Sequence, residues 1–130
     1  MSIDTGTLQP VGLFTGQHVL AELEGVDPDL LDDEQFLRDA LRSALDRSHA
    51  TVCEMIAKRF EPQGVTVLAL LSESHASMHT YPENGSIFID VFTCGHTAQP
   101  EQAVALLAEA LSPTAVNTQT IHRGHDYPAS

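Results

Sequence analysis

The feature that most limits how this chain folds is a short apolar run that ends abruptly in a dense polar cluster. Residues 65–71 are apolar apart from Thr66, and residues 72–83 follow at once with serines, histidines and glutamates. A run this short, bounded by turn residues, is typical of a buried strand. We therefore predict a central strand, covered on at least one face, that delivers the polar cluster to its end.

A second strand-like run ends in the same way. Residues 86–93 alternate along their length and run directly into Cys94 and Gly95. The dipeptide Asn84-Gly85, just before this run, is a strong signal for a hairpin turn. Two strands that each end in reactive side chains indicate one chemical site.

The remaining hydrophobic pattern predicts an α+β fold. Further strands are expected at residues 17–23, 51–60 and 115–122, with helices at residues 34–47 and 100–111. The order β-α-β-β-β-α-β predicts a two-layer sandwich, with two helices on one face of a largely antiparallel sheet. A chain of 130 residues is expected to form a single domain, residues 1–130, with nothing left to cover the other face. A homodimer through that face is therefore expected.

Composition excludes several classes of partner. A net charge of −12 with only six Lys+Arg argues against nucleic acid and against anionic membrane surfaces. The chain has no apolar run long enough to span a membrane, and its first residues do not resemble a secretory signal. Cys53 and Cys94 lie far apart in the sequence and are expected to be free thiols in a cytoplasmic protein.

The polar cluster is compatible with several kinds of chemistry when it is considered alone. Ser74 is a possible nucleophile with His75 or His79 as its base, although it lacks the glycine-flanked turn typical of serine hydrolases. His75 and His79 are possible metal ligands with Glu83, as are His122 and His125. Cys94 is either a catalytic thiol or a buried packing residue.

A different chemistry suits the pair Glu73-Ser74 better. A serine hydroxyl in a tight turn can attack the carbonyl of the preceding residue, which converts the amide into an ester. Elimination of that ester leaves the serine as an N-terminal pyruvoyl group. The reaction needs a hydroxyl to hold the ester and a base for the serine α-proton, and Thr66 and His79 are candidates for these parts.

At these residues the chain closely resembles the prokaryotic S-adenosylmethionine decarboxylase proenzymes, which are pyruvoyl enzymes. The resemblance rests on Ser-Glu-Ser-His-x-x-x-His-Thr-Tyr-Pro-Glu at residues 72–83 and on Asp-Val-Phe-Thr-Cys-Gly at residues 90–95. It extends to Gly-Gln-His-Val at residues 16–19, Phe-x-Pro-x-Gly at residues 60–64 and Arg-Gly at residues 123–124. With these motifs, the resemblance extends over about 110 residues in family-like order and spacing.

The resemblance implies self-cleavage between Glu73 and Ser74 into residues 1–73 and 74–130, with Ser74 becoming the pyruvoyl group. That carbonyl would form a Schiff base with the amine of S-adenosylmethionine and accept electrons as carbon dioxide leaves. The product, S-adenosylmethioninamine, supplies polyamine (spermidine) synthesis. The resemblance also implies that His79 is a base during processing, that Thr66 hydrogen-bonds the ester intermediate, and that Cys94 is the acid that reprotonates the substrate carbanion.

Substrate contacts also follow from the resemblance. Glu83 would hold the ribose hydroxyls, Phe60 would stack against the adenine, and Leu20 would make an apolar contact on the other side of that ring. The family works as a dimer of cleaved protomers, with active sites near the interface.

The chain departs from the family pattern in three places. Thr66 stands where the family has serine, Gln17 stands where it has arginine, and residues 67–70 lack the usual glycine. A pocket that has changed would favour another amine substrate, such as arginine or ornithine, because the pyruvoyl chemistry is common to them. A non-catalytic homologue that never processes is a second alternative.

Overall fold

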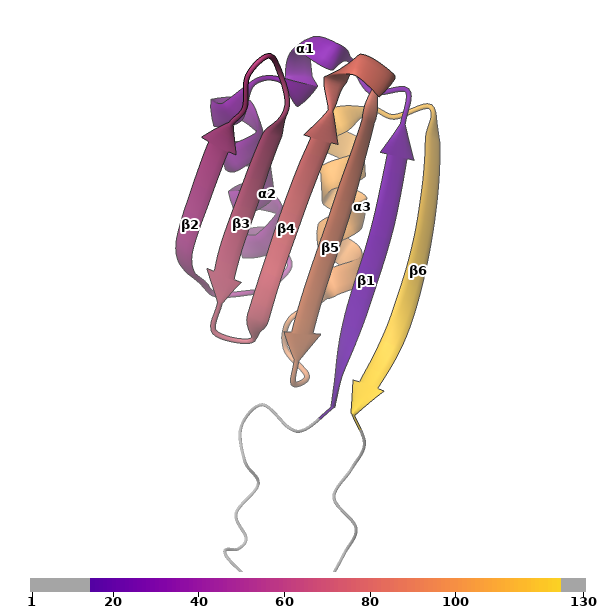
Figure 1. Cartoon of the computed structure of the whole chain (residues 1–130). Coiled ribbons are helices and arrows are strands. Elements are labelled where there is room, and N and C mark those ends of the chain that lie inside the picture. The colour runs from indigo at the N-terminus through magenta and orange to yellow at the C-terminus, as the bar shows by residue number, and fades with distance from the viewer. Residues whose placement is uncertain (1–14, 125–130) are drawn as a thin grey trace, which may run out of the picture.

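The computed structural model describes residues 15–124, which form one six-stranded antiparallel sheet with helices packed on one face (Figure 1). The strands lie in the order β2-β3-β4-β5-β1-β6. Their bounds are β1 (Thr15–Glu24), β2 (Val52–Arg59), β3 (Val65–Leu71), β4 (Ser74–Tyr81), β5 (Ser86–Cys94) and β6 (Ala115–Gly124). The helical segments are α1 (Pro28–Leu31), α2 (Glu34–Arg47), the 3-10 turn η1 (Pro82–Asn84) and α3 (Pro100–Leu111).

The two long helices begin where the sequence provides helix-starting residues. Asp33 caps α2, since its side chain accepts a hydrogen bond from the backbone N–H of Phe36. Pro100 begins α3 at its first position, where the missing N–H costs nothing. Each helix then buries one apolar stripe against the sheet, which gives the two layers.

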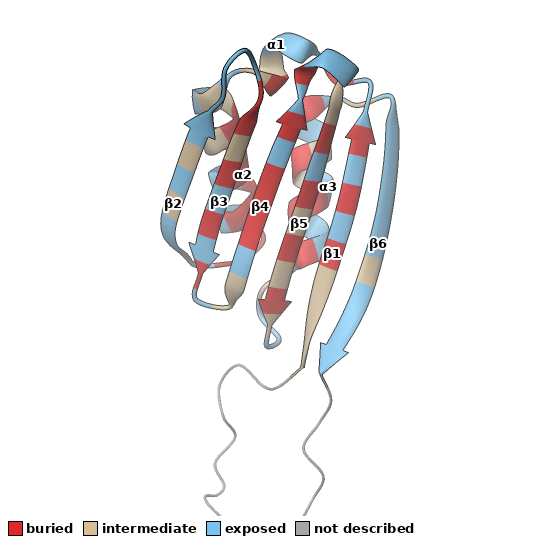
Figure 2. Cartoon of the chain, viewed as in Figure 1, coloured by how far each residue is buried: buried red, intermediate tan, exposed pale blue. Residues whose placement is uncertain are grey.

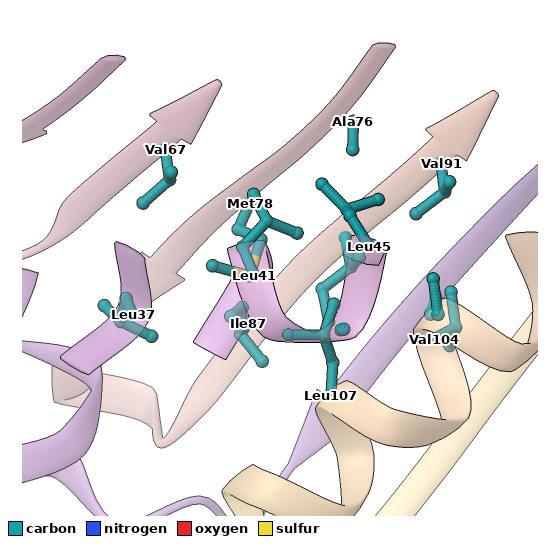
Figure 3. Close-up of a cluster of buried hydrophobic side chains, with 14 of the residues drawn as sticks. Leu37, Leu41, Leu45, Val67, Ala76, Met78, Ile87, Val91, Val104 and Leu107 are labelled. Carbon is teal, nitrogen blue, oxygen red and sulfur yellow. The ribbon is translucent and has the colours of Figure 1, made fainter. Parts of the chain in front are cut away.

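The core lies between these helices and one face of the sheet (Figure 3). Leu37, Leu41 and Leu45 of α2 and Leu107 of α3 are fully buried against strand residues such as Met78. Along β3, β5 and the second half of β1, buried and more exposed residues alternate, as the bands of colour in Figure 2 show, and β4 follows the same pattern except at Ser77, which is also buried. Successive side chains of a strand point to opposite faces, so this alternation indicates that only one face of the sheet is covered.

The predicted fold class is confirmed, and so are the central position of residues 65–71 and their cover on one face. The structure also contains elements that the sequence analysis did not predict. Residues 74–81 form the strand β4, and residues 28–31 form the short helix α1. The expectation about a secretory signal falls on residues outside the described range.

Within residues 15–124, no helix is long and apolar enough to cross a membrane.

A buried threonine joins three elements near the C-terminal end of β4. The Thr80 side chain is in the core layer, where its hydroxyl donates to the carbonyl of Leu31 at 2.7 Å and accepts from the backbone N–H of Val65 at 2.8 Å. A buried polar group that loses its partner pays the full cost of desolvation. This hydroxyl therefore stabilises the contact between α1, β3 and β4.

Replacing Thr80 by valine should destabilise the protein by about 1–3 kcal/mol, because two buried backbone groups lose their partner while the shape is kept. The measurement is the free energy of unfolding from chemical denaturation. The matched control is Thr80→Ser, which keeps the hydroxyl and should lose less stability. Equal losses in both variants would mean that packing, and not hydrogen bonding, explains the role of Thr80.

Candidate active site

The Glu73–Ser74 peptide joins the two-residue connection that follows β3 to the first residue of β4, and it is held from several sides. The backbone N–H of Ser72 donates to the carbonyl of Thr51 at 3.0 Å, and the carboxylate of Glu73 accepts from the backbone N–H of Thr51 at 3.1 Å. The backbone N–H of Cys94 donates to the carbonyl oxygen of Glu73 at 3.1 Å. Ser74 has φ of 158°, at the edge of the extended region.

The bond from Cys94 has a chemical consequence. When a nucleophile adds to a carbonyl, negative charge develops on its oxygen, and an N–H group already aimed at that oxygen stabilises the transition state. The carbonyl of Glu73 is polarised in this way, and the hydroxyl of Ser74 belongs to the next residue in the chain. The connection therefore has the parts that attack of Ser74 on Glu73 requires.

Next to this connection, on the open face of the sheet, Asp90 accepts hydrogen bonds from three side chains. His18 contacts its Oδ2 at 2.8 Å, His75 contacts the same oxygen at 3.1 Å, and Ser77 donates to Oδ1. Burial by itself raises the pKa of Asp90, but hydrogen bonds from Ser77 and His18 and the nearby His75 outweigh it and hold the pKa below its usual range. Asp90 is therefore an ionised carboxylate at neutral pH.

A second group of the predicted residues lies at the other end of β4. Thr66 and His79 are paired across β3 and β4, and the Thr66 hydroxyl is 3.2 Å from Nδ1 of His79. Both residues line a hollow of about 230 Å³ together with Phe60 and Glu83. The structure thus brings together four residues that lie up to 23 positions apart in the sequence.

Leu20 does not line that hollow. It borders a separate depression of about 350 Å³ on the open face, which it shares with His79, Phe88 and Asp90. The predicted placement of Leu20 opposite Phe60 across one ring is therefore not formed within a single chain.

The residues around Ser74 are also far from the group formed by His79, Thr66, Phe60 and Glu83. Ser74 begins β4, and His79 lies five positions further along the same strand, a separation of about 16 Å at the rise of a β-strand. Cys94 is on the Ser74 side, since its backbone contacts Glu73. Within one chain, neither His79 nor Thr66 reaches Ser74.

Comparison with known proteins identifies the family. The family model for S-adenosylmethionine decarboxylase matches residues 17–124. A proenzyme of this name from Parasynechococcus marenigrum is 53% identical over 98 residues, which are 75% of this chain and 77% of that protein. One from Archaeoglobus fulgidus is 37% identical over 86% of this chain and 100% of that protein. The crystal structure of an adenosylmethionine decarboxylase from Aquifex aeolicus superposes with a TM-score of 0.83 at 34% identity, covering 93% of this chain and 98% of that one.

This chain belongs to the S-adenosylmethionine decarboxylase family. The resemblance seen in the sequence is confirmed. The chain is a pyruvoyl-dependent carboxy-lyase that acts on S-adenosylmethionine for polyamine synthesis and generates its prosthetic group from its own backbone. The arrangement around Glu73 and Ser74 fits such a group, because a serine follows a carbonyl that is already hydrogen-bonded by Cys94.

The possible metal ligands of the polar cluster do not converge in this decarboxylase. His75 and His79 lie four positions apart on a strand, about 13 Å, which is too far for one ion. His125 lies outside the described residues. Among the described residues, the His/Cys/Asp/Glu group close enough to share an ion is His18, His75 and Asp90.

Asp90 and two of its partners, His18 and Ser77, are site residues to which the sequence analysis gave no role, whereas its third partner, His75, was a candidate base and metal ligand. Asp90 and His18 appear in the motifs of the family resemblance, but no role was assigned to either residue. A weak signal was available, because an aspartate among the alternating residues of a predicted strand must face either the core or the open side. Its partners could not be known, because they come from β1 and β4 and depend on the register of the sheet.

Replacing Asp90 by asparagine should lower stability by about 1–2 kcal/mol at pH 7, because the charged acceptor of three hydrogen bonds is lost. Its pKa is lower in the folded than in the unfolded state, so the ionised form favours folding. The contribution is complete above the unfolded pKa of about 4 and is lost as the pH falls through the folded value. The measurement is chemical denaturation as a function of pH, with both proteins carrying Ser74→Ala so that neither chain is cut. A difference that stays constant down to pH 3 would contradict the role of the charge.

Proposed function

We propose that this decarboxylase matures by cleavage between Glu73 and Ser74, giving chains of residues 1–73 and 74–130, and that Ser74 becomes its pyruvoyl group. The observation that supports the proposal most strongly is the hydrogen bond from the Cys94 backbone to the Glu73 carbonyl. It preorganises the carbonyl that Ser74 must attack, and among residues 15–124 no other polar contact in the cluster has that effect.

The first step forms a bond between Ser74 Oγ and the Glu73 carbonyl carbon and breaks the amide bond, which leaves an ester and a free amine on Ser74. In the second step a base removes the Ser74 α-proton, and the carboxylate of Glu73 leaves. Tautomerisation and hydrolysis then release ammonia from the former serine. The Cys94 N–H stabilises the oxyanion of the first step, Thr66 hydrogen-bonds the ester, and His79 is the base of the second step.

The mature pyruvoyl group supplies a carbonyl that binds the substrate amine and accepts the electrons released with carbon dioxide. The residues of this chain position the substrate around it. Phe60 stacks on the adenine, Glu83 accepts hydrogen bonds from the ribose hydroxyls, and Cys94 returns a proton to the substrate carbon. The shared hollow of Phe60 and Glu83 supports their joint role.

The active unit in this proposal is a homodimer in which each site takes residues from both copies. Ser74 and Cys94 lie about 16 Å from His79 along one strand, so a single chain leaves its site incomplete. A two-fold axis that runs across the strands, between two sheets packed face to face, would reverse the strand direction of the second copy. The Ser74 end of one copy would then meet the His79, Thr66, Phe60 and Glu83 end of the other.

The open face of the sheet has the side chains for such packing. Phe88, Leu68 and Leu70 are 44–55% exposed on it, although residues of this size are normally buried. Ile56 and Ile121 extend the apolar surface to both edge strands. Sheets packed face to face lie about 10 Å apart, a distance that side chains from both copies span. Leu20, which does not reach the Phe60 hollow of its own chain, also faces this interface.

A cytoplasmic location is part of the proposal. It is supported by two cysteines, Cys53 and Cys94, that are not joined in a disulfide.

Cleavage should be visible in the intact mass of the purified protein under denaturing conditions. We expect two chains that divide at Glu73/Ser74, the second lighter than its sequence by one ammonia, and carbon dioxide release from S-adenosylmethionine but not from arginine or ornithine. Ser74→Ala should leave one full-length chain without activity. Ser72→Ala is the matched control, because it removes the neighbouring exposed hydroxyl and should be cleaved normally. A full-length wild-type chain would refute cleavage at this bond.

Sites shared between copies should show complementation. Chains carrying Ser74→Ala and chains carrying His79→Ala are each expected to be inactive, but a mixed dimer contains one site with Ser74 from one chain and His79 from the other. Co-expression of the two variants should therefore restore decarboxylase activity, with one working site per mixed dimer. Sites built within single chains would give no activity in the mixture, and that result would exclude the shared arrangement.

A further inference from the structure

We propose that His75 is the base that removes the hydroxyl proton of Ser74 in the first step of self-cleavage, and that Asp90 positions His75 for this task. The inference rests on the proposed cleavage between Glu73 and Ser74. It assigns the first proton transfer to a histidine different from the one that acts in the second step.

The first argument is the pair of contacts that His75 makes. Its Nδ1 is 3.3 Å from Oγ of Ser74, and its Nε2 is 3.1 Å from Oδ2 of Asp90. One imidazole therefore joins the nucleophile to a carboxylate. Serine nucleophiles are activated by this combination, in which the carboxylate orients the imidazole and stabilises its charged form. A distance of 3.3 Å is common before substrate or transition state tightens such a contact.

The protonation of His75 follows from its partners. Asp90 is ionised and has no proton to donate, so Nε2 of His75 must carry the hydrogen of that bond. In the neutral imidazole the other nitrogen, Nδ1, then has a free lone pair. This lone pair faces the Ser74 hydroxyl, which is the orientation that a base needs.

Asp90 is itself held in place from the opposite side. Arg123 contacts Nδ1 of His18 at 3.1 Å, and a guanidinium can only donate, so Nδ1 of His18 is an acceptor. Nε2 of His18 therefore carries a proton and donates it to Asp90 at 2.8 Å. Arg123 is fixed in turn over the ring of Phe92, 4.5 Å from its centroid. The chain of contacts from β6 through β1 and β5 to β4 fixes both the position and the charge of the group that orients His75.

His79 cannot replace His75 in this step within the same chain, because it lies at the other end of β4 and its Nδ1 contacts Thr66. The two steps of cleavage also remove protons from different atoms of Ser74, first the hydroxyl and later the α-carbon. A base next to Ser74 in sequence suits the first step, because it is present before any second copy binds.

These groups account for every proton that is transferred in the first step. Nδ1 of His75 takes the proton from Ser74 Oγ as the bond from Oγ to the Glu73 carbonyl carbon forms. The Cys94 N–H stabilises the negative charge on the Glu73 oxygen. As the carbon–nitrogen bond breaks, the protonated His75 returns the proton to the Ser74 nitrogen, which becomes the free amine of the ester.

The test is a time course of cleavage for the full chain made by cell-free synthesis, followed on denaturing gels and by intact mass. His75→Ala should slow the appearance of residues 1–73 by about 100-fold or more, as expected when a general base is removed. Added imidazole should restore part of the rate. Asp90→Asn should slow cleavage less, because it leaves the base but not its orientation. His96→Ala, which removes an exposed histidine nearby, is the control and should be cleaved at the wild-type rate.

Hydroxylamine separates the two steps, because it cuts an ester at Glu73 but not an amide. His79→Ala should accumulate a full-length chain that hydroxylamine cuts, whereas His75→Ala should remain an amide that hydroxylamine leaves intact. His75→Gln, a variant closer in size, should behave like His75→Ala, and circular dichroism should show both variants folded.

Several results would overturn the inference. Cleavage of folded His75→Ala at the wild-type rate would do so, and so would an ester that accumulates in this variant, since the first step would then proceed without His75. Loss of cleavage on adding a chelator to the wild-type chain would also do so, because His18, His75 and Asp90 would then hold a metal ion. A wild-type chain that is never cut at Glu73/Ser74 would instead refute the proposed function itself.

Discussion

The structure depends on one constraint, that helices cover only one face of the sheet. Because successive side chains of a strand point to opposite faces, this cover divides every strand into a core side and an open side. In β4, Ala76 and Met78 are in the core while His75 and His79 face the open side. The hydrophobic burial that stabilises the fold is therefore also what gathers the reactive side chains on one surface.

Strand register then determines which of those side chains meet. The antiparallel pairing of β4 with β5 sets Ser77 opposite Asp90, and the pairing of β3 with β4 sets Thr66 opposite His79. A slip of one residue would turn the core residues of a strand toward water, so the register is as stable as the core itself. The apolar face thus sets which residues lie opposite one another, and hydrogen bonds such as those to Asp90 then orient the side chains.

The sequence alone allowed much of this to be predicted, and the limits have physical causes. Helical periodicity at residues 34–47 and the apolar run at residues 65–71 predicted the layers, because burial acts locally on both. The strand β4 was missed because its core-facing positions include small or polar residues such as Ala76 and Thr80, which conceal the alternation. The hydrogen bonds to Asp90 were missed because register joins residues that no local pattern connects. The motifs named the candidate site residues, but not that these fall into two separate groups within one chain.

That separation gives a reason for two histidines in one short strand. The proposed cleavage removes two protons from Ser74, and the structure offers a base for each at a different distance. His75 is next to Ser74 within the chain, whereas His79 would meet a Ser74 only in the proposed dimer. Under these two assignments, a lone chain forms the ester and returns to the amide, while elimination requires the second copy. Irreversible maturation would then occur only in the dimer, where the substrate contacts of Phe60 and Glu83 are also complete.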